Sequence, residues 1–422
     1  MQLEIPSKAP INKNRFPSLN LPAGVIHPWY QEGSLLNLPA AVAAKLGCDS
    51  LPHPALQSPF LQSLPELKQV ILVLLDGLSY ERFSSWIERT ELFHRLSSDG
   101  FVMPLTSVVP STTCTVLTTL WTGRSPAEHA VMGYELFLKE YGIVSNMISH
   151  SPIKMPGEKG ILYRAGFEPE TAALHRNLGS ILKESGISSY AFLNKHIRRS
   201  GLSRMHYADV LSTGFASLPE MWITLRTLAE KKDSKKRFIW CYYEGIDNMS
   251  HHRHPDKEFP RAEFEALMHS MQEYFLKPSD LRPGRTLMLF TADHGQIATP
   301  DNSDFDLSNH PDLLQMLHLY PTGENRLTYL HVQPGKVESV QEYFQKHWGD
   351  TFVVRASQEV LEQGLFGPGQ PAPQTRSRIG DLAVISTSDN YLWWGDRSNP
   401  LEGRHGGLSA SEMVVPLAGF VL

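Results

Sequence analysis

Three runs of consecutive apolar residues constrain the fold of this chain more than any other feature. They lie in the segments QVILVLLDG, RFIWCYYEGID and RTLMLFTADHG. Runs without alternating polar residues are typical of strands buried on both faces, as in a parallel sheet. Amphipathic helical stretches separate them, including LPEMWITLRTLAEK and EFEALMHSMQEYFL. This alternation predicts an α/β fold with a doubly wound, mostly parallel sheet sandwiched by helices.

The chain of 422 residues is longer than a typical domain, so we expect an inserted or additional unit. Residues 1–65 hold many prolines and little periodicity, which predicts an N-terminal arm laid over the surface. Residues 134–209 are expected to add a further unit to the main sheet. Residues 308–380 read as strand, helix, strand, helix and a proline-rich loop, which predicts a small inserted α/β cap. The core then comprises residues 66–307 and 381–422.

Composition excludes several classes of protein. The net charge is −5, and the dense basic stretch KKDSKK at 231–236 is interpreted as a solvated loop, which argues against a nucleic-acid binder. The first twenty residues lack the apolar segment of a signal peptide, and no run of about 18 apolar residues occurs. We therefore expect a cytoplasmic protein without a membrane partner. The number of cysteines is odd and their spacing is wide, which predicts reduced thiols in the core at Cys48, Cys114 and Cys241.

Acidic residues follow each of the three predicted buried strands: Asp76, Asp247 and Asp293. Because the carboxyl ends of parallel strands meet at one edge of a sheet, these carboxylates should lie close together, where they require positive charge. Imidazoles stand close to two of them in the sequence, namely His251 and His294, and His405 lies in GRHGG, where the glycines let the backbone bend closely around a ligand. Six oxygen and nitrogen ligands without a thiolate suit two divalent metal ions, zinc in the first place and manganese as the alternative. Two sites of three ligands leave positions open for a substrate.

A cluster of hydroxyl residues, VVPSTTCTVLTTLWTGRSP at 108–126, precedes a helical pattern. The start of a helix favours anions, and a metal ion beside a hydroxyl there would favour its alkoxide form. The segment is therefore the expected place of a nucleophile. Ser111, Thr112, Thr113 and Thr115 are the candidates.

Together these motifs resemble the alkaline phosphatase superfamily, and most closely its nucleotide pyrophosphatase/phosphodiesterase group. Their order along residues 70–415 matches that of the group. The resemblance implies that Thr113, ten residues before Gly123 of a Thr-Gly turn, is the nucleophile, with Thr112 as the alternative. It also implies that one metal is held by Asp76, Thr113, Asp293 and His294, and the other by Asp247, His251 and His405.

The chain departs from its relatives at three places. The diesterase members usually carry an Asn three residues after the nucleophile, where this chain has Val116, so a backbone amide or another side chain must hold the phosphoryl oxygen. Sulfatase relatives have Pro and Arg where Thr115 and Leu117 stand, which argues against a sulfatase. The Asp-Ser-Ala sequence of the alkaline phosphatases is absent, which favours a diester or pyrophosphate substrate.

The sequence thus predicts a two-metal phosphohydrolase that cleaves small phosphodiesters or nucleotide pyrophosphates. One metal activates Thr113 for in-line attack, the other stabilises the leaving oxygen, and water hydrolyses the covalent phosphothreonine. Cap residues would shape the leaving-group pocket. Two alternatives remain: a phosphomonoesterase or phosphonate hydrolase of the same superfamily, and a catalytically silent, metal-dependent binder of a phosphorylated ligand. His252, His254 and Arg124 are interpreted as structural or surface residues.

Overall fold

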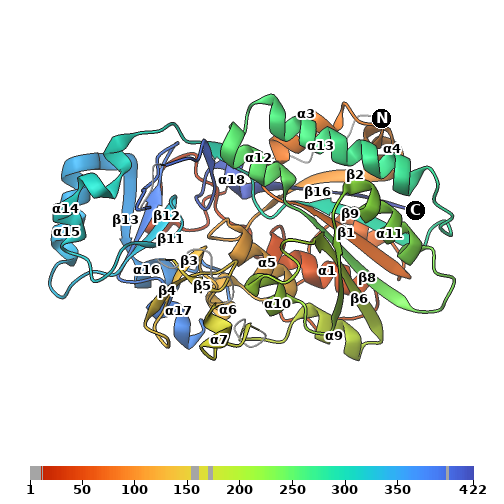
Figure 1. Ribbon diagram of the computed structural model, residues 1–422, viewed down its shortest axis with the longest axis horizontal. Helices are drawn as coiled ribbons and strands as arrows, with labels where there is room; N and C mark the ends of the chain where they lie inside the picture. Colours follow the sequence, from red (N-terminus) through yellow and green to blue (C-terminus); the bar gives the residue numbers. More distant parts are fainter. Residues whose placement is uncertain (1–10, 12, 154–160, 170–173, 396–398) are drawn as a thin grey trace.

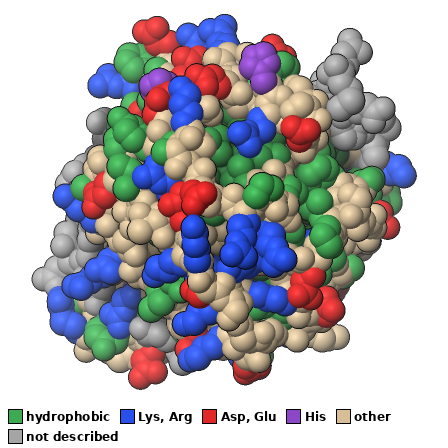
Figure 2. Space-filling view, turned by 90° about the vertical axis from the view of Figure 1, so that its right-hand side faces the viewer, with side chains coloured by type: hydrophobic (Ala, Val, Ile, Leu, Met, Phe, Trp, Pro, Cys, Tyr) green, Lys and Arg blue, Asp and Glu red, His purple; other side chains and the backbone are tan. Residues whose placement is uncertain are grey.

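Besides a small two-stranded sheet, the computed structural model contains two seven-stranded sheets that lie side by side along the long axis of the molecule (Figure 1). It describes residues 11, 13–153, 161–169, 174–395 and 399–422. We name the sheet that contains β1 the main sheet and the other the second sheet. Acidic and basic side chains are intermixed on the face at the main-sheet end of the molecule, with Lys and Arg more frequent in its lower half (Figure 2).

The main sheet has the strand order β2-β16-β9-β1-β8-β6-β7. The neighbours from β9 to β7 run parallel, whereas β16 runs antiparallel to both β9 and β2. The apolar runs of the sequence form its centre, and every residue of β1 is buried. The strands are β1 (Gln69–Leu75), β2 (Gly100–Thr106), β6 (Ile187–Asn194), β7 (Val210–Phe215), β8 (Lys236–Tyr243), β9 (Thr286–Thr291) and β16 (Val414–Val421).

Helices cover both faces of the main sheet, which confirms the expected α/β sandwich. Figure 1 shows α3, α4, α12 and α13 above the sheet and α1, α5, α9 and α10 below it. Trp121 of α5 packs against Trp240 of β8 with ring centroids 5.2 Å apart, so this helix rests on the sheet. The helices are α1 (Leu38–Lys45), α3 (Tyr80–Ile87), α4 (Leu92–Asp99), α5 (Thr113–Thr122), α9 (Leu178–Glu184), α10 (Gly201–His206), α11 (Leu218–Ala229), α12 (Gly245–Arg253) and α13 (Glu258–Met271).

The second sheet has the order β13-β14-β12-β11-β3-β4-β5, and its neighbours pair antiparallel. It packs on a hydrophobic cluster of its own that includes Phe344 and Trp348. Its strands are β3 (Glu135–Leu138), β4 (Ile143–Asn146), β5 (Ser151–Pro152), β11 (Thr322–Gly323), β12 (Leu327–Leu330), β13 (Phe352–Ala356) and β14 (Leu382–Ser386). Its helices include α15 (Val337–Trp348), α16 (Ser357–Glu362) and α17 (Pro373–Arg378).

The second sheet corrects the expected extent of the cap. Residues 308–380 supply only β11, β12 and β13 to it, whereas β14 lies beyond this range. The strands β3, β4 and β5 come from residues 134–209, which the sequence assigned to the main sheet. Among the described strands of this stretch, only β6 belongs to the main sheet. The reason is physical: an antiparallel sheet can join strands from distant parts of the chain, and local periodicity does not specify the partner.

The N-terminal segment packs into the core and is not confined to the surface. Leu19, Leu35 and Leu38 are fully buried, and the Asn37 side-chain amide donates to the backbone oxygens of Tyr30 and Pro54. The short elements here are η1 (Pro17–Leu19), η2 (Leu35–Asn37) and α2 (Pro59–Ser63).

The remaining short elements lie in the connections between these helices and strands. They are α6 (Pro126–His129), α7 (Ile161–Arg164), η3 (Gln272–Leu276), β10 (Ile297–Ala298), η4 (Ser303–Phe305), η5 (Leu307–Asn309), α14 (Pro311–Leu314), η6 (Gly349–Thr351), β15 (Gly403–Arg404) and α18 (Ala410–Met413). Cys48, Cys114 and Cys241 are free and buried, as the sequence predicted. No helix in the described part of the chain has both the length and the apolar character needed to cross a membrane.

Candidate metal centre

The acidic residues after β1, β8 and β9 meet at one edge of the main sheet. Asp76 directly follows β1, Asp247 lies in the first turn of α12 after β8, and Asp293 follows β9. Since β1 lies between β8 and β9, the three carboxylates converge. Asp76 and Asp293 are 2% and 0% exposed, so two of these charges are withdrawn from water.

One group of potential ligands surrounds His294. A carboxylate oxygen of Asp76, one of Asp293 and a ring nitrogen of His294 lie within 4.8 Å of one another. His294 Nε2 is 3.5 Å from Asp76 Oδ1 and 3.4 Å from Asp293 Oδ2. Thr113 Oγ1 is 3.2 Å from the same nitrogen. The structure therefore brings together all four residues that the resemblance assigned to the first metal.

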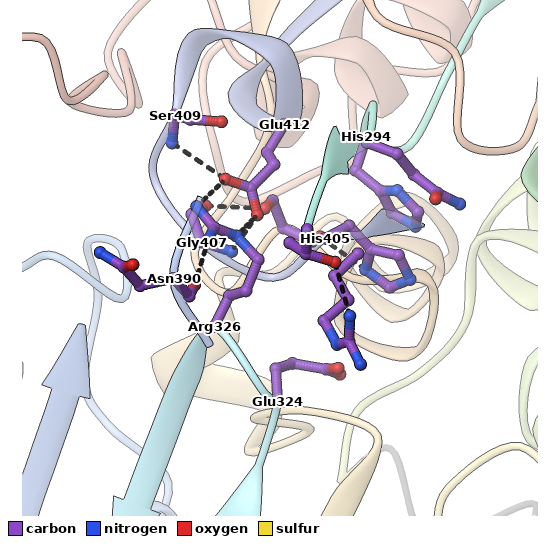
Figure 3. Close-up of polar contacts among 12 residues, drawn as sticks. His294, Glu324, Arg326, Asn390, His405, Gly407, Ser409 and Glu412 are labelled. Carbon is purple, nitrogen blue, oxygen red and sulfur yellow. Dashed lines mark hydrogen bonds and ion pairs between the residues drawn. The ribbon is translucent and has the colours of Figure 1, made fainter. Parts of the chain in front are cut away.

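The second group adjoins the first. Asp247, His294 and His405 offer ligand atoms within 4.8 Å of one another, so His294 lies between the two groups. His251 Nε2 is 3.4 Å from Asp247 Oδ2, and its ring centroid is 5.1 Å from that of His405. The rings of His294 and His405 stack at 3.8 Å, as Figure 3 shows. All seven residues singled out in the sequence thus lie in one cluster, which we call the site pocket.

The three imidazoles are oriented as metal ligands would be. In each ring Nδ1 lies beside a backbone oxygen: 2.8 Å from Gly403 O for His251, 3.1 Å from Gly295 O for His294 and 3.2 Å from Ser111 O for His405. A proton on Nδ1 satisfies each of these oxygens and leaves the Nε2 lone pair free. Burial, reinforced by His294 and His251, holds the pKa of His405 well below its usual range, which favours the neutral form that binds a metal.

The carboxylates lack the positive charge that their burial requires. Asp76 Oδ1 and Asp293 Oδ2 are buried and have no hydrogen-bond partner among the described residues. Burial and the charges of Asp293 and Asp247 raise the pKa of Asp76 well above its usual value, and burial also raises the pKa of Asp293. Such oxygens are costly unless they bind a cation. The donor set therefore fits a pair of divalent ions, and its nitrogen and oxygen atoms suit zinc or manganese.

Among the candidate hydroxyls, Thr113 has the geometry of a nucleophile. It is the first residue of α5, where backbone N–H groups without helical partners favour an anion, and its hydroxyl lies against His294. Thr112 instead hydrogen-bonds the Glu324 side chain, and Ser111 Oγ donates to Gly407 O at 2.8 Å. Helix α5 ends at Gly123, whose φ of 62° explains the glycine of the Thr-Gly turn.

The residues interpreted as bystanders stay outside the ligand groups. His252 is exposed, and its Nδ1 lies 3.0 Å from Asn248 O. His254 ends α12 in a left-handed conformation with φ 69°. Arg124 forms an ion pair with Glu128 at 2.9 Å.

Several contacts of the pocket escaped sequence reasoning. The Tyr242 hydroxyl donates to Asp76, and Gln296 Nε2 donates to the Asp247 backbone oxygen at 3.0 Å. Gln296 follows the Asp-His-Gly motif directly, so its place in the sequence could have predicted a contact with the site. Glu324, which precedes β12, has no such local signal, since the pairing of the second sheet brings it here.

Glu324 adds a further carboxyl group to the rim of the pocket. Its Oε1 accepts from Tyr134 N at 2.7 Å. Burial raises the pKa of Glu324 to about 8, aided by repulsion from Glu135 and Asp247 and opposed by hydrogen bonds from Thr112 and Tyr134.

The sequence matches a family model described as type I phosphodiesterase / nucleotide pyrophosphatase over residues 70–408, in agreement with the resemblance drawn from the motifs. No curated protein matches it. The fold is similar to murine ectonucleotide pyrophosphatase/phosphodiesterase 5 in complex with AMP, with a TM-score of 0.63, 15% identity, and coverage of 83% of this chain and 87% of that chain. The human protein gives a TM-score of 0.62 at 17% identity, with coverage of 83% and 87%.

Phosphonoacetate hydrolase from Sinorhizobium meliloti 1021 in complex with phosphonoformate has a similar fold as well. Its TM-score is 0.60 at 16% identity, with coverage of 84% of this chain and 91% of that chain. At such identities the likeness establishes the fold and leaves the reaction to be argued from the site.

Proposed function

Because the chain belongs to the type I phosphodiesterase / nucleotide pyrophosphatase family, we propose that it is a two-metal phosphohydrolase acting on small phosphodiesters or nucleotide pyrophosphates. The observation that carries this proposal is the convergence of three carboxylates and three imidazoles beside the Thr113 hydroxyl, with buried carboxylate oxygens that lack a partner among the described residues. That donor set supports a site for divalent cations next to a nucleophile.

The ligands divide between two ions. Asp76, Asp293 and His294, together with Thr113 Oγ1, would hold one ion, while Asp247, His251 and His405 would hold the other. When bound, the two ions supply the positive charge that favours the Thr113 alkoxide and stabilises the leaving oxygen. Zinc is the first choice for these ligands and manganese the second.

Thr113 performs the covalent step. Its Oγ forms a bond to phosphorus as the bond from phosphorus to the leaving oxygen breaks, which gives a phosphothreonine ester. Water then cleaves that ester, and the Thr113 oxygen leaves with the electron pair and regains a proton. The position at the start of α5 lets the protein hold the hydroxyl in one orientation, because Thr113 is buried and its helix rests on the main sheet.

The first turn of α5 offers hydrogen-bond donors for a phosphoryl oxygen, which the Val116 side chain cannot provide. The Val116 N–H is taken by Thr112 O at 2.9 Å, whereas the N–H groups of the preceding helical residues have no partner within the helix. These groups and the helix dipole favour phosphoryl oxygens at this end. We propose that backbone N–H groups take the place of the Asn that diesterase relatives carry.

A phosphonate hydrolase is a second candidate. The similar fold of phosphonoacetate hydrolase supports it, since the same donor set could hold a phosphonate. Glu324 hydrogen-bonds Thr112, the neighbour of Thr113, so above its raised pKa of about 8 its negative charge would disfavour the second negative charge of a monoester or phosphonate.

A substrate panel tests the proposal. Metal-free protein is reconstituted with zinc or manganese, its metal content is measured, and turnover is followed on bis(p-nitrophenyl) phosphate, p-nitrophenyl phosphate and phosphonoacetate. We expect turnover of the diester that chelation abolishes and metal restores. Acid quenching followed by mass spectrometry should find a phosphoryl ester on the peptide that contains Thr113. Metal-loaded protein that cleaves none of these compounds would contradict the proposal and favour a silent binder.

A further inference from the structure

A fully buried ion pair joins the second sheet to the loop that carries His405. Arg326 precedes β12, and its Nε and Nη2 lie 2.6 Å and 2.9 Å from the two carboxylate oxygens of Glu412 (Figure 3). Both side chains are 0% exposed. Arg326 also donates to the backbone oxygens of Asn390 and Ser388, so its guanidinium is fixed on several sides. We name this pair the Arg326–Glu412 clamp.

Glu412 connects the clamp to the metal-binding loop. It completes the capping box of α18, in which its carboxylate accepts from Ser409 N at 3.2 Å. Glu412 Oε1 also accepts a hydrogen bond from Gly407 N at 2.9 Å, which is not part of a capping box. Gly407 lies two residues after His405, so the carboxylate fixes the backbone beside this ligand.

From Gly407 the contacts return to the ligand itself. Gly407 O accepts a hydrogen bond from Ser111 Oγ at 2.8 Å. Ser111 O in turn is the partner of His405 Nδ1 at 3.2 Å, the contact that directs Nε2 into the pocket. A shift of Gly407 would therefore change both the position of the His405 backbone and the group that orients its ring.

The other metal group depends less on the Glu412 carboxylate. Gly295, next to His294, donates its N–H to the backbone oxygen of Glu412 at 2.9 Å. Asp293 is held through Ser107, whose hydroxyl donates to Asp293 O at 2.6 Å. A change of the Glu412 side chain leaves these backbone contacts in place, so its effect should differ between the two groups.

Stability alone gives little reason for such a pair. A buried ion pair is often no more stabilising than apolar side chains of the same volume, although removal of one partner is costly. Burial opposes ionisation of Glu412, yet Arg326 and the surrounding N–H groups hold the pKa of this carboxyl below its usual value. The bidentate geometry instead fixes direction and distance, as a positioning element requires.

We propose that Arg326 and Glu412 are positioning residues that set the metal affinity of the group formed by Asp247, His251 and His405. The inference rests on the proposed two-metal function and deepens it. The second sheet thereby contributes to the metal centre through a residue that touches neither metal nor substrate.

Metal titration of the metal-free, full-length protein tests this inference. Zinc is titrated against a chromophoric chelator into the wild type, Glu412→Gln and Glu140→Gln. The last is a matched control, since Glu140 pairs with the buried Arg378 at 3.0 Å, away from the His405 loop. Glu412→Gln should weaken one of two zinc affinities by about 10- to 100-fold and leave the other within about threefold. Glu140→Gln should change neither.

A second variant guards against a folding defect. Arg326→Met combined with Glu412→Leu removes both charges, and buried ion pairs tolerate such apolar replacement. It should unfold cooperatively in a thermal scan and show the same selective loss of one zinc affinity. Arg326→Lys keeps the charge but loses the planar, two-pronged guanidinium. Its zinc affinity should therefore be weakened less than that of the double variant.

The outcomes separate this inference from the proposed function. Two zinc affinities that are unchanged in Glu412→Gln, or weakened equally, would overturn the clamp while the two-metal function stands. A wild type that binds fewer than two ions would overturn the proposed function and this inference together.

Discussion

The main sheet and the second sheet contribute to the candidate site in different ways. The main sheet supplies candidate ligands directly, because Asp76, Asp247 and Asp293 follow neighbouring parallel strands. The second sheet is antiparallel, draws its strands from distant stretches and offers Glu324 and Arg326 from the segment before β12. On the proposed function, the edge of the main sheet would carry the chemistry, whereas the second sheet would position the residues around it. Changes in the first should therefore affect the reaction most.

Loss of the nucleophile should have the largest effect. We expect Thr113→Ala to lower kcat on bis(p-nitrophenyl) phosphate by at least about a thousandfold, because no hydroxyl remains to form the covalent ester. Thermal unfolding and metal content should stay close to those of the wild type. Thr112→Ala serves as the matched control and should retain most activity, since its hydroxyl faces Glu324. The reverse pattern would move the nucleophile to Thr112.

A ligand change at the main-sheet edge should separate function from stability. Asp293→Asn should weaken one metal affinity by more than about a hundredfold. The metal-free protein should nevertheless become more stable, by about 1–3 kcal/mol near neutral pH, because an uncompensated buried charge is removed. Urea unfolding of metal-free protein measures this gain, and a loss of stability at neutral pH would contradict the account.

The same variant has a defined pH dependence. Burial raises the pKa of Asp293 in the folded state, so the folded protein retains this proton at pH values where the unfolded chain has lost it. The contribution of this carboxyl to stability is therefore full below its unfolded pKa and is lost as the pH rises through its folded pKa. The stabilisation by Asn should be larger at about pH 8 than at about pH 5. A gain that increases toward acid pH would refute the assignment of the buried charge.

A change in the second sheet should alter selectivity more than rate. Glu324→Gln should raise kcat/KM for p-nitrophenyl phosphate by about tenfold and change the diester value little, because repulsion of the second phosphoryl charge is relieved. Since the pKa of Glu324 is raised to about 8, the carboxyl is ionised above that pH, and the effect should increase toward alkaline pH. Equal changes for both substrates would mean that Glu324 does not face the phosphoryl group.

The smallest effect is expected where a supporting hydrogen bond is removed from the main-sheet edge. Tyr242→Phe leaves Asp76 without the hydroxyl that donates to it. We expect up to about tenfold weaker binding of one metal ion, with folding retained. Tyr243→Phe is the matched control, because the neighbouring hydroxyl contacts Glu263 instead. Identical behaviour of the two variants in zinc titrations would argue against a role for Tyr242 in orienting Asp76.

The same difference between the sheets explains what the sequence could predict. The buried runs specify parallel strands, and each acidic candidate ligand lies shortly after the end of its strand. The local pattern therefore predicted that Asp76, Asp247 and Asp293 lie close together. The α/β fold was predicted correctly on these grounds, and the family was predicted correctly from the resemblance of the ordered motifs. His405 was singled out by the glycines of its GRHGG segment, although it comes from a loop outside the central strands, and its assignment to a particular metal came from the resemblance.

The second sheet carries no comparable signal. The strands β3 and β4 are short and only partly buried, so their pattern did not reveal that they pair with β11 and with each other. Arg326 and Glu412 are 86 residues apart, and each reads as an ordinary charged residue in its own segment. Pairing energies between distant antiparallel strands and a buried ion pair depend on tertiary structure, which local periodicity does not report.

The central claim is that two divalent ions lie beside Thr113, one held by Asp76, Asp293 and His294 and the other by Asp247, His251 and His405. Anomalous diffraction at the zinc edge from crystals of zinc-loaded protein measures this most directly. The account predicts two anomalous peaks, one within each ligand group and both next to the threonine hydroxyl. An empty pocket, or zinc bound only at other residues, would contradict it.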